Sequence, residues 1–167
     1  GMLLSRRWIF LGDHRQLPPV VTSHHADADV TTSVFEHLHA LYGSHLLDVS
    51  YRMNDQVCAV IGETFYDGRL TSAPEAAGRR MPFPGGGALD DILDPERSAV
   101  LARVDHLQPG MRSVEEANLI ADLVADLLTR HGVSADDIAI VAPFRSQVRM
   151  VRSALQRKAT PGSALIT

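Results

Sequence analysis

Chemically active side chains gather in a short segment that directly follows an apolar run. Residues 8–11 are Trp-Ile-Phe-Leu, and residues 12–16 are Gly-Asp-His-Arg-Gln. An apolar run of strand length that gives way to a polar segment is typical of a buried parallel strand with a functional loop at its carboxyl end. The loop offers the amide of Gln16, followed by the rigid pair Pro18-Pro19. We therefore expect residues 12–20 to form part of a ligand site.

Two more polar segments follow predicted strands. Ser50-Tyr51-Arg52-Met53 lies at the end of a strand predicted at 45–50, and residues 143–147, Pro-Phe-Arg-Ser-Gln, follow a strand predicted at 137–142. Ligands of parallel sheets bind at the carboxyl ends of the strands, so all three segments are expected at one edge. The guanidinium of Arg52 suits the charge that spreads over phosphate oxygens during phosphoryl transfer. The alternative for Tyr51 and Arg52 is an ordinary strand end with a surface arginine.

A row of arginines follows the third segment. Arg145, Arg149, Arg152 and Gln156 are spaced by four, three and four residues, which places them on one face of a helix. Residues 145–159 contain five basic side chains and no acidic one. Such a face can grip a sugar-phosphate backbone, and Phe144 is the best candidate for stacking on a base. A simple solvated helix face is the open alternative.

The elements that must position these residues alternate along the chain. Periodicity predicts helices at 32–42, 54–66 and 113–131 and a helix of about 14 residues after Pro143. Asn54 is expected to cap the second helix, and Ser113 begins a capping box with Glu116 at the start of the third. Strands are expected at 8–11, 45–50, 98–104, 137–142 and 163–167. This alternation predicts an α/β fold with a parallel sheet flanked by helices. Residues 68–97 are rich in Gly and Pro and predict a flexible connection, in which the glycines at 85–87 lack the Lys and Ser/Thr of a phosphate loop.

Composition restricts the protein class. The chain has 167 residues, 45% of them apolar, and a net charge of −4, which suits about one domain with a buried core. Its single cysteine, Cys58, excludes an internal disulfide framework and favours a cytoplasmic location, with the thiol buried in a helix. No apolar run reaches the length of a membrane span, and no secretory signal is visible. We expect no metal site, because the adjacent pair His24-His25 supplies too few ligands.

The three polar segments together resemble motifs of one family. Residues 12–20 resemble the helicase motif G-D-x-x-Q-L-P-P, and residues 50–53 resemble the motif written Q-Y-R-M or N-Y-R-S. Residues 143–148 resemble the downstream segment P-Y-R-x-Q-V, and residues 66–70 and 115–117 also fit. The chain is similar to superfamily 1 DNA/RNA helicases of the Upf/Dna2/RecD2-like branch, in their AAA-type C-terminal region. Ser50 and Phe144 depart from the usual residues of these motifs.

The resemblance implies a role for each segment. It implies that Gln16 senses the γ-phosphate of ATP, that Arg52 acts as an arginine finger, and that Tyr51 stacks on the nucleotide. Gly12 and Asp13 belong to the same nucleotide site. The implied nucleic-acid contacts are Pro18, Pro143, Phe144, Arg145, Gln147 and Arg149. The implied fold is RecA-like, as in P-loop NTPases, with the last strand and motif loop of a first domain at 1–22 and part of a second domain at 23–167.

Two sequence motifs that helicases need for ATP hydrolysis are absent from these residues. The sequence contains no G-x-x-x-x-G-K-[S/T] loop and no acidic Mg²⁺-binding motif. The resemblance therefore predicts a helicase fragment that is inactive alone, whose parent uses ATP and Mg²⁺, acts on single-stranded or partly duplex DNA or on RNA, and supplies the remaining helicase domains. The alternative is a non-catalytic interaction module derived from a helicase. An unrelated small hydrolase is disfavoured, because no nucleophile elbow is present.

Overall fold

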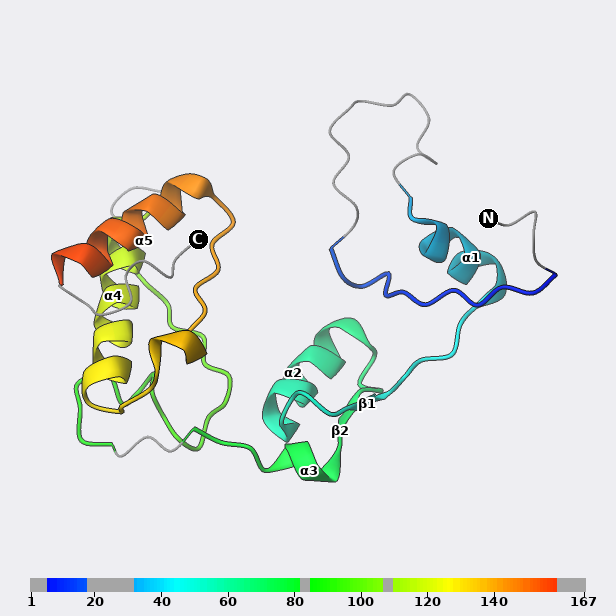
Figure 1. Ribbon diagram of the computed structural model, residues 1–167, viewed down its shortest axis with the longest axis horizontal. Coiled ribbons are helices and arrows are strands. Elements are labelled where there is room, and N and C mark those ends of the chain that lie inside the picture. Colours follow the sequence, from blue (N-terminus) through cyan, green and yellow to red (C-terminus); the bar gives the residue numbers. More distant parts are fainter. Residues whose placement is uncertain (1–5, 18–31, 82–84, 107–109, 159–167) are drawn as a thin grey trace. The chain divides into compact units, whose positions relative to one another are not determined.

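The computed structural model describes residues 6–17, 32–81, 85–106 and 110–158, and these divide into two compact units. The first unit belongs to Gly1–Ala77 and the second to Gly78–Thr167. Figure 1 shows α1, β1, α2, β2 and α3 in the first unit and α4 and α5 in the second. Each unit is described by itself below. Among the described residues, no helix combines the length and apolarity needed to cross a membrane.

Both main helices of the first unit begin at a residue whose side chain caps them, and α1 ends at a glycine. Helix α1 spans Val34–Tyr42, and the Ser33 hydroxyl accepts a hydrogen bond from the Glu36 amide at 3.1 Å. Gly43 ends α1 with a φ of 71°, a conformation that glycine adopts without steric cost. Helix α2 spans Asp55–Phe65, and the side chain of Asn54 accepts from the Val57 amide at 2.9 Å. The helices predicted at 32–42 and 54–66 are confirmed.

A short parallel sheet packs against α2. Strand β1 covers Val49–Ser50 and β2 covers Thr71–Ser72, in a parallel register that pairs Val49 with Thr71. Helix α2 forms the crossover and packs on β2, followed by the short helix α3 at Pro74–Ala77. Gly62 allows this close packing, because an added Cβ would lie 3.2 Å from the Leu70 carbonyl oxygen and would require a shift of a few tenths of an ångström. The sequence placed β2 inside a structureless connection and so missed this strand.

The buried core of the first unit is small. Cys58, Ala73 and Ala76 are each at most 1% exposed, and helix α1 has no buried residue among those described. Burial of the Cys58 thiol is confirmed, and burial raises its pKa.

Most of the strands predicted from the sequence are not strands in the structure. Residues 8–11, 98–104 and 138–142 have no strand, and within 45–50 only Val49–Ser50 pairs. A strand exists only where a neighbouring segment exchanges hydrogen bonds with it, and the described residues supply such a neighbour to β1 alone. Ile9, Leu101 and Val141 are accordingly 88–93% exposed. The structure confirms helices with a small parallel sheet, while residues 163–167 lie outside the described residues.

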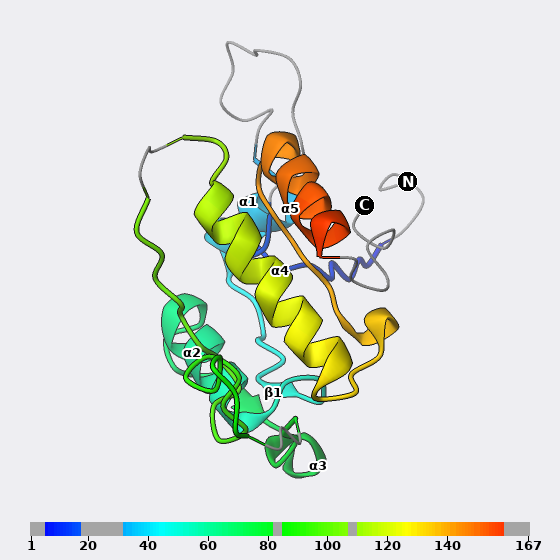
Figure 2. The ribbon, with the colours of Figure 1, turned by 90° about the vertical axis from the view of Figure 1, so that its left-hand side faces the viewer.

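The second unit is built on a pair of helices. Helix α4 spans Val114–Thr129, α5 spans Arg145–Arg157, and the short 3-10 helix η3 covers Ala135–Asp137. Figure 2 shows α4 and α5 side by side, and the contacts between them form the apolar core. Its buried members are Ala117, Ala121, Val124, Val151, Ala154 and Leu155. The helix predicted at 113–131 and the helix after Pro143 are confirmed.

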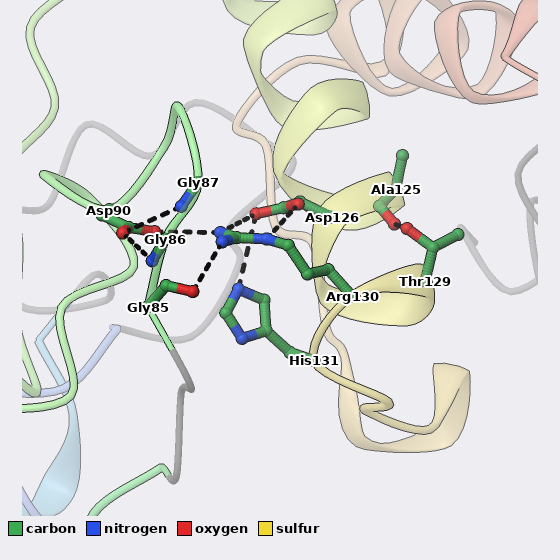
Figure 3. Close-up of polar contacts among 9 residues, drawn as sticks. All are labelled: Gly85, Gly86, Gly87, Asp90, Ala125, Asp126, Thr129, Arg130 and His131. Carbon is green, nitrogen blue, oxygen red and sulfur yellow. Dashed lines mark hydrogen bonds and ion pairs between the residues drawn. The ribbon is translucent and has the colours of Figure 1, made fainter.

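A polar network holds the triple-glycine segment against α4. The Arg130 guanidinium binds the Asp126 carboxylate at 2.7 Å, the Asp90 carboxylate at 2.9 Å and the Gly85 carbonyl at 3.0 Å (Figure 3). Asp90 in turn accepts from the amides of Gly86 and Gly87. The hydrogen bonds from Arg130 lower the pKa of both carboxylates. The flexibility predicted for 68–97 stays a prediction, but this segment includes β2, α3 and an anchored turn.

Candidate nucleotide and nucleic-acid site residues

The polar loop after residues 8–11 is organised around one carboxylate. Oδ2 of Asp13 accepts hydrogen bonds from the Gln16 side-chain amide at 2.9 Å and from the Tyr66 hydroxyl. Oδ1 of Asp13 accepts from the Arg15 backbone amide at 3.0 Å. Three donors from three residues therefore converge on Asp13. We call residues 12–16 the Gln loop.

The electrostatics of Asp13 favour the ionised form. Burial by itself would raise the pKa of Asp13, but the hydrogen bonds from Tyr66, Arg15 and Gln16 outweigh it and lower the pKa. The hydrogen bond to Asp13 raises the pKa of the Tyr66 hydroxyl, and burial of that hydroxyl raises it further. At neutral pH the pair is thus a carboxylate that accepts from a neutral phenol.

Helix α1 holds the Gln loop from a second direction. The His14 ring stacks on the ring of His39 with centroids 4.2 Å apart, and Phe35 lies 6.4 Å from His14. A Cβ at Gly12 would lie 2.7 Å from Cγ of Phe35, so only glycine permits this approach without displacement of the ring. The loop glycine is therefore required for close packing on α1. Nothing in the sequence pattern predicted that partner.

The Tyr51-Arg52 segment forms a bend directly after β1. The Ser50 hydroxyl accepts from the Met53 amide at 3.1 Å, and the Ser72 hydroxyl donates to the Met53 carbonyl at 2.6 Å. These bonds fix both ends of the bend, while Tyr51 remains 65% exposed and Arg52 is exposed. Ser50, which departs from the usual motif residue, thus supplies the hydroxyl that closes the turn.

Helix α2 connects the Tyr51-Arg52 bend to the Gln loop. Its N-cap, Asn54, lies two residues after Arg52, and its C-cap is Tyr66, whose hydroxyl reaches Asp13. The first two polar segments therefore lie in one unit, Gly1–Ala77. The third segment, residues 143–147, lies in the other unit. Pro18 lies outside the described residues.

The basic side chains along α5 differ in their contacts. Arg145 and Arg149 are exposed, as are Pro143 and, to 45%, Phe144. At the end of α5, the basic side chains contact α4. Lys158 forms an ion pair with Asp122, and Arg157 donates to Asn118 at 3.3 Å. Arg157 and Lys158 are exposed as well, so basic side chains are exposed at both ends of α5, and those at its end also bond to α4.

Gln147 has a different environment from its neighbours. Its side chain is 5% exposed; its amide oxygen accepts from the Ser113 amide at 2.7 Å, and its amide nitrogen donates to the Ser113 carbonyl and to Glu116. Ser113 was predicted to begin a capping box with Glu116, and its hydroxyl does accept from the Glu116 amide. The reciprocal bond of a capping box, from the Ser113 amide to the Glu116 side chain, is replaced. The Ser113 amide donates to Gln147 instead, and the Glu116 carboxylate contacts Gln147 and His106. A nucleic-acid contact through Gln147 stays a prediction, and its amide groups already bind α4.

No metal centre is formed by the described residues. They include no group of three or more His, Cys, Asp or Glu side chains able to hold an ion. Both carboxylate oxygens of Asp13 are already occupied by hydrogen-bond donors.

Comparisons with family models and with curated proteins point to the same family. A family model described as an AAA domain matches residues 30–166. DNA-binding protein SMUBP-2 of Mus musculus is 32% identical over 173 residues, which cover 94% of this chain and 17% of the relative. The DNA replication ATP-dependent helicase/nuclease DNA2 of Homo sapiens is 25% identical, over 93% of this chain and 17% of its own length. The 3'-5' exoribonuclease HELZ2 of Homo sapiens is 28% identical over 96% of this chain and 6% of its own.

The matched region is a small part of each relative. The chain spans 17% of the length of the first two relatives and 6% of the third. No solved structure matches the chain. The chain belongs to the AAA-domain family matched at residues 30–166, and with it to the superfamily 1 helicases of the Upf/Dna2-like branch.

Proposed function

We propose that this chain is the part of an ATP-dependent superfamily 1 helicase that senses the γ-phosphate and transmits the signal toward the nucleic acid. Gln16 is the sensor, Arg52 is the arginine finger, and Tyr51 stacks on the nucleotide. The parent protein couples ATP hydrolysis to movement along DNA or RNA. Family membership and one relative that is named an ATP-dependent helicase support the proposal.

One observation carries the proposal furthest, namely the state of the Gln16 side chain. Gln16 is exposed, and one of its two amide hydrogens is donated to Asp13. Because ionised Asp13 can only accept, it fixes which side of the amide faces it. Among the described residues the second amide hydrogen has no acceptor, so it can donate to a phosphate oxygen, which is the chemistry of a γ-phosphate sensor. A sensor needs a defined orientation before the ligand arrives, and Asp13 provides it.

Arg52 fits the role of a charge-stabilising group. Its side chain is exposed on a bend whose ends are fixed by Ser50 and Ser72. A guanidinium that reaches the transferred phosphoryl group is worth about 10³–10⁵-fold in turnover in other nucleotide hydrolases. Exposure on a fixed bend places the Arg52 guanidinium where a ligand can reach it.

Magnesium fits poorly with the described residues. They form no cluster of three acidic or histidine ligands, and the oxygens of Asp13 are taken by Tyr66, Gln16 and Arg15. We derive no step through the ion from this chain. In the proposed helicase, Mg²⁺ is held by other residues of the parent, and this chain alone hydrolyses no ATP.

The nucleic-acid contacts are proposed at the start of α5. The exposed residues there are Pro143, Phe144, Arg145 and Arg149. The buried Gln147 fixes this part of α5 to the start of α4. Arginine side chains bind phosphates regardless of sequence, and an aromatic ring can stack on an unpaired base. A non-catalytic module would keep this surface without the sensor, so the orientation of Gln16 by Asp13 favours the motor over the module.

Substitution of Arg52 in the complete helicase tests the proposal. Arg52→Ala should lower the nucleic-acid-stimulated ATP turnover by at least about 10³-fold, while ATP binding changes little. Arg103→Ala is a matched control, since Arg103 is an exposed arginine in the other unit, outside the proposed nucleotide site. Unchanged turnover in Arg52→Ala would refute the arginine-finger assignment. Nucleic-acid-stimulated turnover by the 167-residue chain alone would refute its dependence on other domains.

A further inference from the structure

We propose that Tyr66 and Asp13 form a positioning pair that orients Gln16 and connects the Gln loop to the C-terminal end of α2. The proposal rests on the proposed function of Gln16 and assigns a role to Tyr66, which the sequence presented only as the end of a helix and the start of the helicase-like segment 66–70. Tyr66 touches no reacting atom in this account. It acts through Asp13.

The geometry brings the two side chains to one atom. The Tyr66 hydroxyl and the Gln16 amide both donate to Oδ2 of Asp13, although Tyr66 and Asp13 are 53 residues apart in the chain. The second oxygen of Asp13 accepts from the Arg15 amide, which fixes the carboxylate plane relative to the loop backbone. A displacement of Tyr66 therefore moves the acceptor that orients Gln16.

Tyr66 is itself held by α2. It is the C-cap residue, and its backbone amide donates to the Gly62 carbonyl at 2.9 Å. Its carbonyl accepts from the Arg69 amide at 3.0 Å, so the backbone on both sides of the ring is fixed. The ring is partly buried, which leaves the hydroxyl as the polar tip of an otherwise packed side chain.

Helix α2 connects the contact between Tyr66 and Asp13 to the Tyr51-Arg52 bend. A hydrogen-bonded helix is a stiff rod, and α2 begins three residues after Arg52, at Asp55, and ends next to Tyr66. A shift of the Tyr51-Arg52 bend on contact with phosphate therefore reaches the Gln loop through α2, Tyr66 and Asp13. The pair links the proposed finger to the proposed sensor within one unit.

Loss of the hydroxyl alone isolates the proposed role. Tyr66→Phe in the complete helicase keeps the ring and removes only the donor to Asp13. We expect it to lower kcat for nucleic-acid-stimulated ATP hydrolysis by about 10-fold to 100-fold, as misplacement of a catalytic group does, with the KM for ATP within about 2-fold of the unmodified value. Asp13→Asn should have a similar effect, because it weakens the same acceptor. Tyr42→Phe is the matched control, since Tyr42 is 81% exposed at the end of α1.

A double-mutant cycle separates positioning from general stability. If Tyr66 acts through Gln16, then Tyr66→Phe should cause no further loss of kcat in a Gln16→Ala background. The same fold-loss in both backgrounds would overturn the proposal, as would an unchanged kcat in Tyr66→Phe when Gln16→Ala lowers it. An unchanged kcat in Gln16→Ala itself would refute the proposed function and the positioning pair together. Loss of kcat in each single variant, with none added in the double variant, supports the pair.

Discussion

The two glutamines of the helicase-like motifs, Gln16 and Gln147, have opposite environments. Gln147 is 5% exposed, and both ends of its amide are bonded to the start of α4. Gln16 is exposed, and a single bond to Asp13 orients its amide. A buried amide with all partners satisfied stabilises the fold, whereas an exposed, oriented one is prepared for a ligand. The same residue type thus supports architecture in one unit and is proposed to support chemistry in the other.

The units around these glutamines differ in the same way. Gln147 lies on α5 beside a core of six buried residues shared with α4. The Gln loop lies in a unit with few buried side chains and is held mainly by hydrogen bonds and ring stacking. The second unit therefore depends on apolar packing, while the first depends on polar anchors that a ligand can rearrange.

The largest expected effect tests the apolar core of the second unit. Leu155 is 1% exposed, so Leu155→Ala should lower the free energy of unfolding by about 2–5 kcal/mol through a cavity between α4 and α5. Hydrogen exchange measured on peptides of α4 and α5 reports this loss. Leu101→Ala is the control, since Leu101 is 88% exposed and should cost about 0.5 kcal/mol or less. Equal protection in both variants would contradict the core assignment.

The next effect tests whether Gln147 is architectural. Gln147→Ala leaves the buried Ser113 amide without its acceptor, which should cost about 1–3 kcal/mol and loosen the first turn of α4. Urea unfolding followed by circular dichroism measures the change. Gln156→Ala, an exposed glutamine on the same helix, should be nearly neutral. If Gln147→Ala were as stable as Gln156→Ala, the contrast between the two glutamines would fail.

A third substitution tests the packing of the Gln loop on α1. In Gly12→Ala the new methyl group would meet the Phe35 ring, so we expect a cost of about 1–2 kcal/mol and weaker packing of the loop on α1. Thermal unfolding and exchange of the amides in α1 measure it. Gly78→Ala is the control, because a Cβ there meets no atom within 4 Å. A neutral Gly12→Ala would show that α1 does not restrain the loop.

The smallest effect concerns pH. The pKa of Tyr66 is raised above 10.0 in the fold, so its contribution is complete below pH 10.0 and is lost as the pH rises through the raised value. The pKa of Asp13 is lowered below 3.8, so its contribution is present above pH 3.8 and is lost as the pH falls through the lowered value. Urea unfolding from pH 7 to 11 should show the alkaline loss, about 1 kcal/mol or less. Tyr66→Phe should abolish it, whereas Tyr42→Phe should retain it.

Local signals in the sequence predicted the helices well. Asn54 and Ser113 cap the helices that they were predicted to begin, because capping depends on residues only a few positions apart. The strands failed for the opposite reason: an extended apolar run becomes a strand only through a distant partner, and β2 was missed as the partner of β1.

The candidate site shows the same limit. The resemblance to helicase motifs pointed to Gln16 and Arg52, and both are exposed in the structure. Tyr66 as an anchor of Asp13, and Asp122 as the partner of Lys158, depend on contacts across 53 and 36 positions that no local pattern reveals. The resemblance implied that Gln147 contacts nucleic acid, and only the packing of α5 on α4 shows why it is buried.

The contrast between the two glutamines can be tested in one measurement on the complete helicase. It compares nucleic-acid-stimulated ATP turnover per folded molecule in Gln16→Ala and Gln147→Ala, with the folded fraction taken from thermal unfolding. We predict that Gln16→Ala lowers turnover by at least about 10²-fold with an unchanged melting temperature, as loss of a preorganised donor does. Gln147→Ala should lower the melting temperature and leave turnover per folded molecule within about 10-fold. Full turnover in Gln16→Ala would contradict the assignment of the Gln loop as the γ-phosphate sensor.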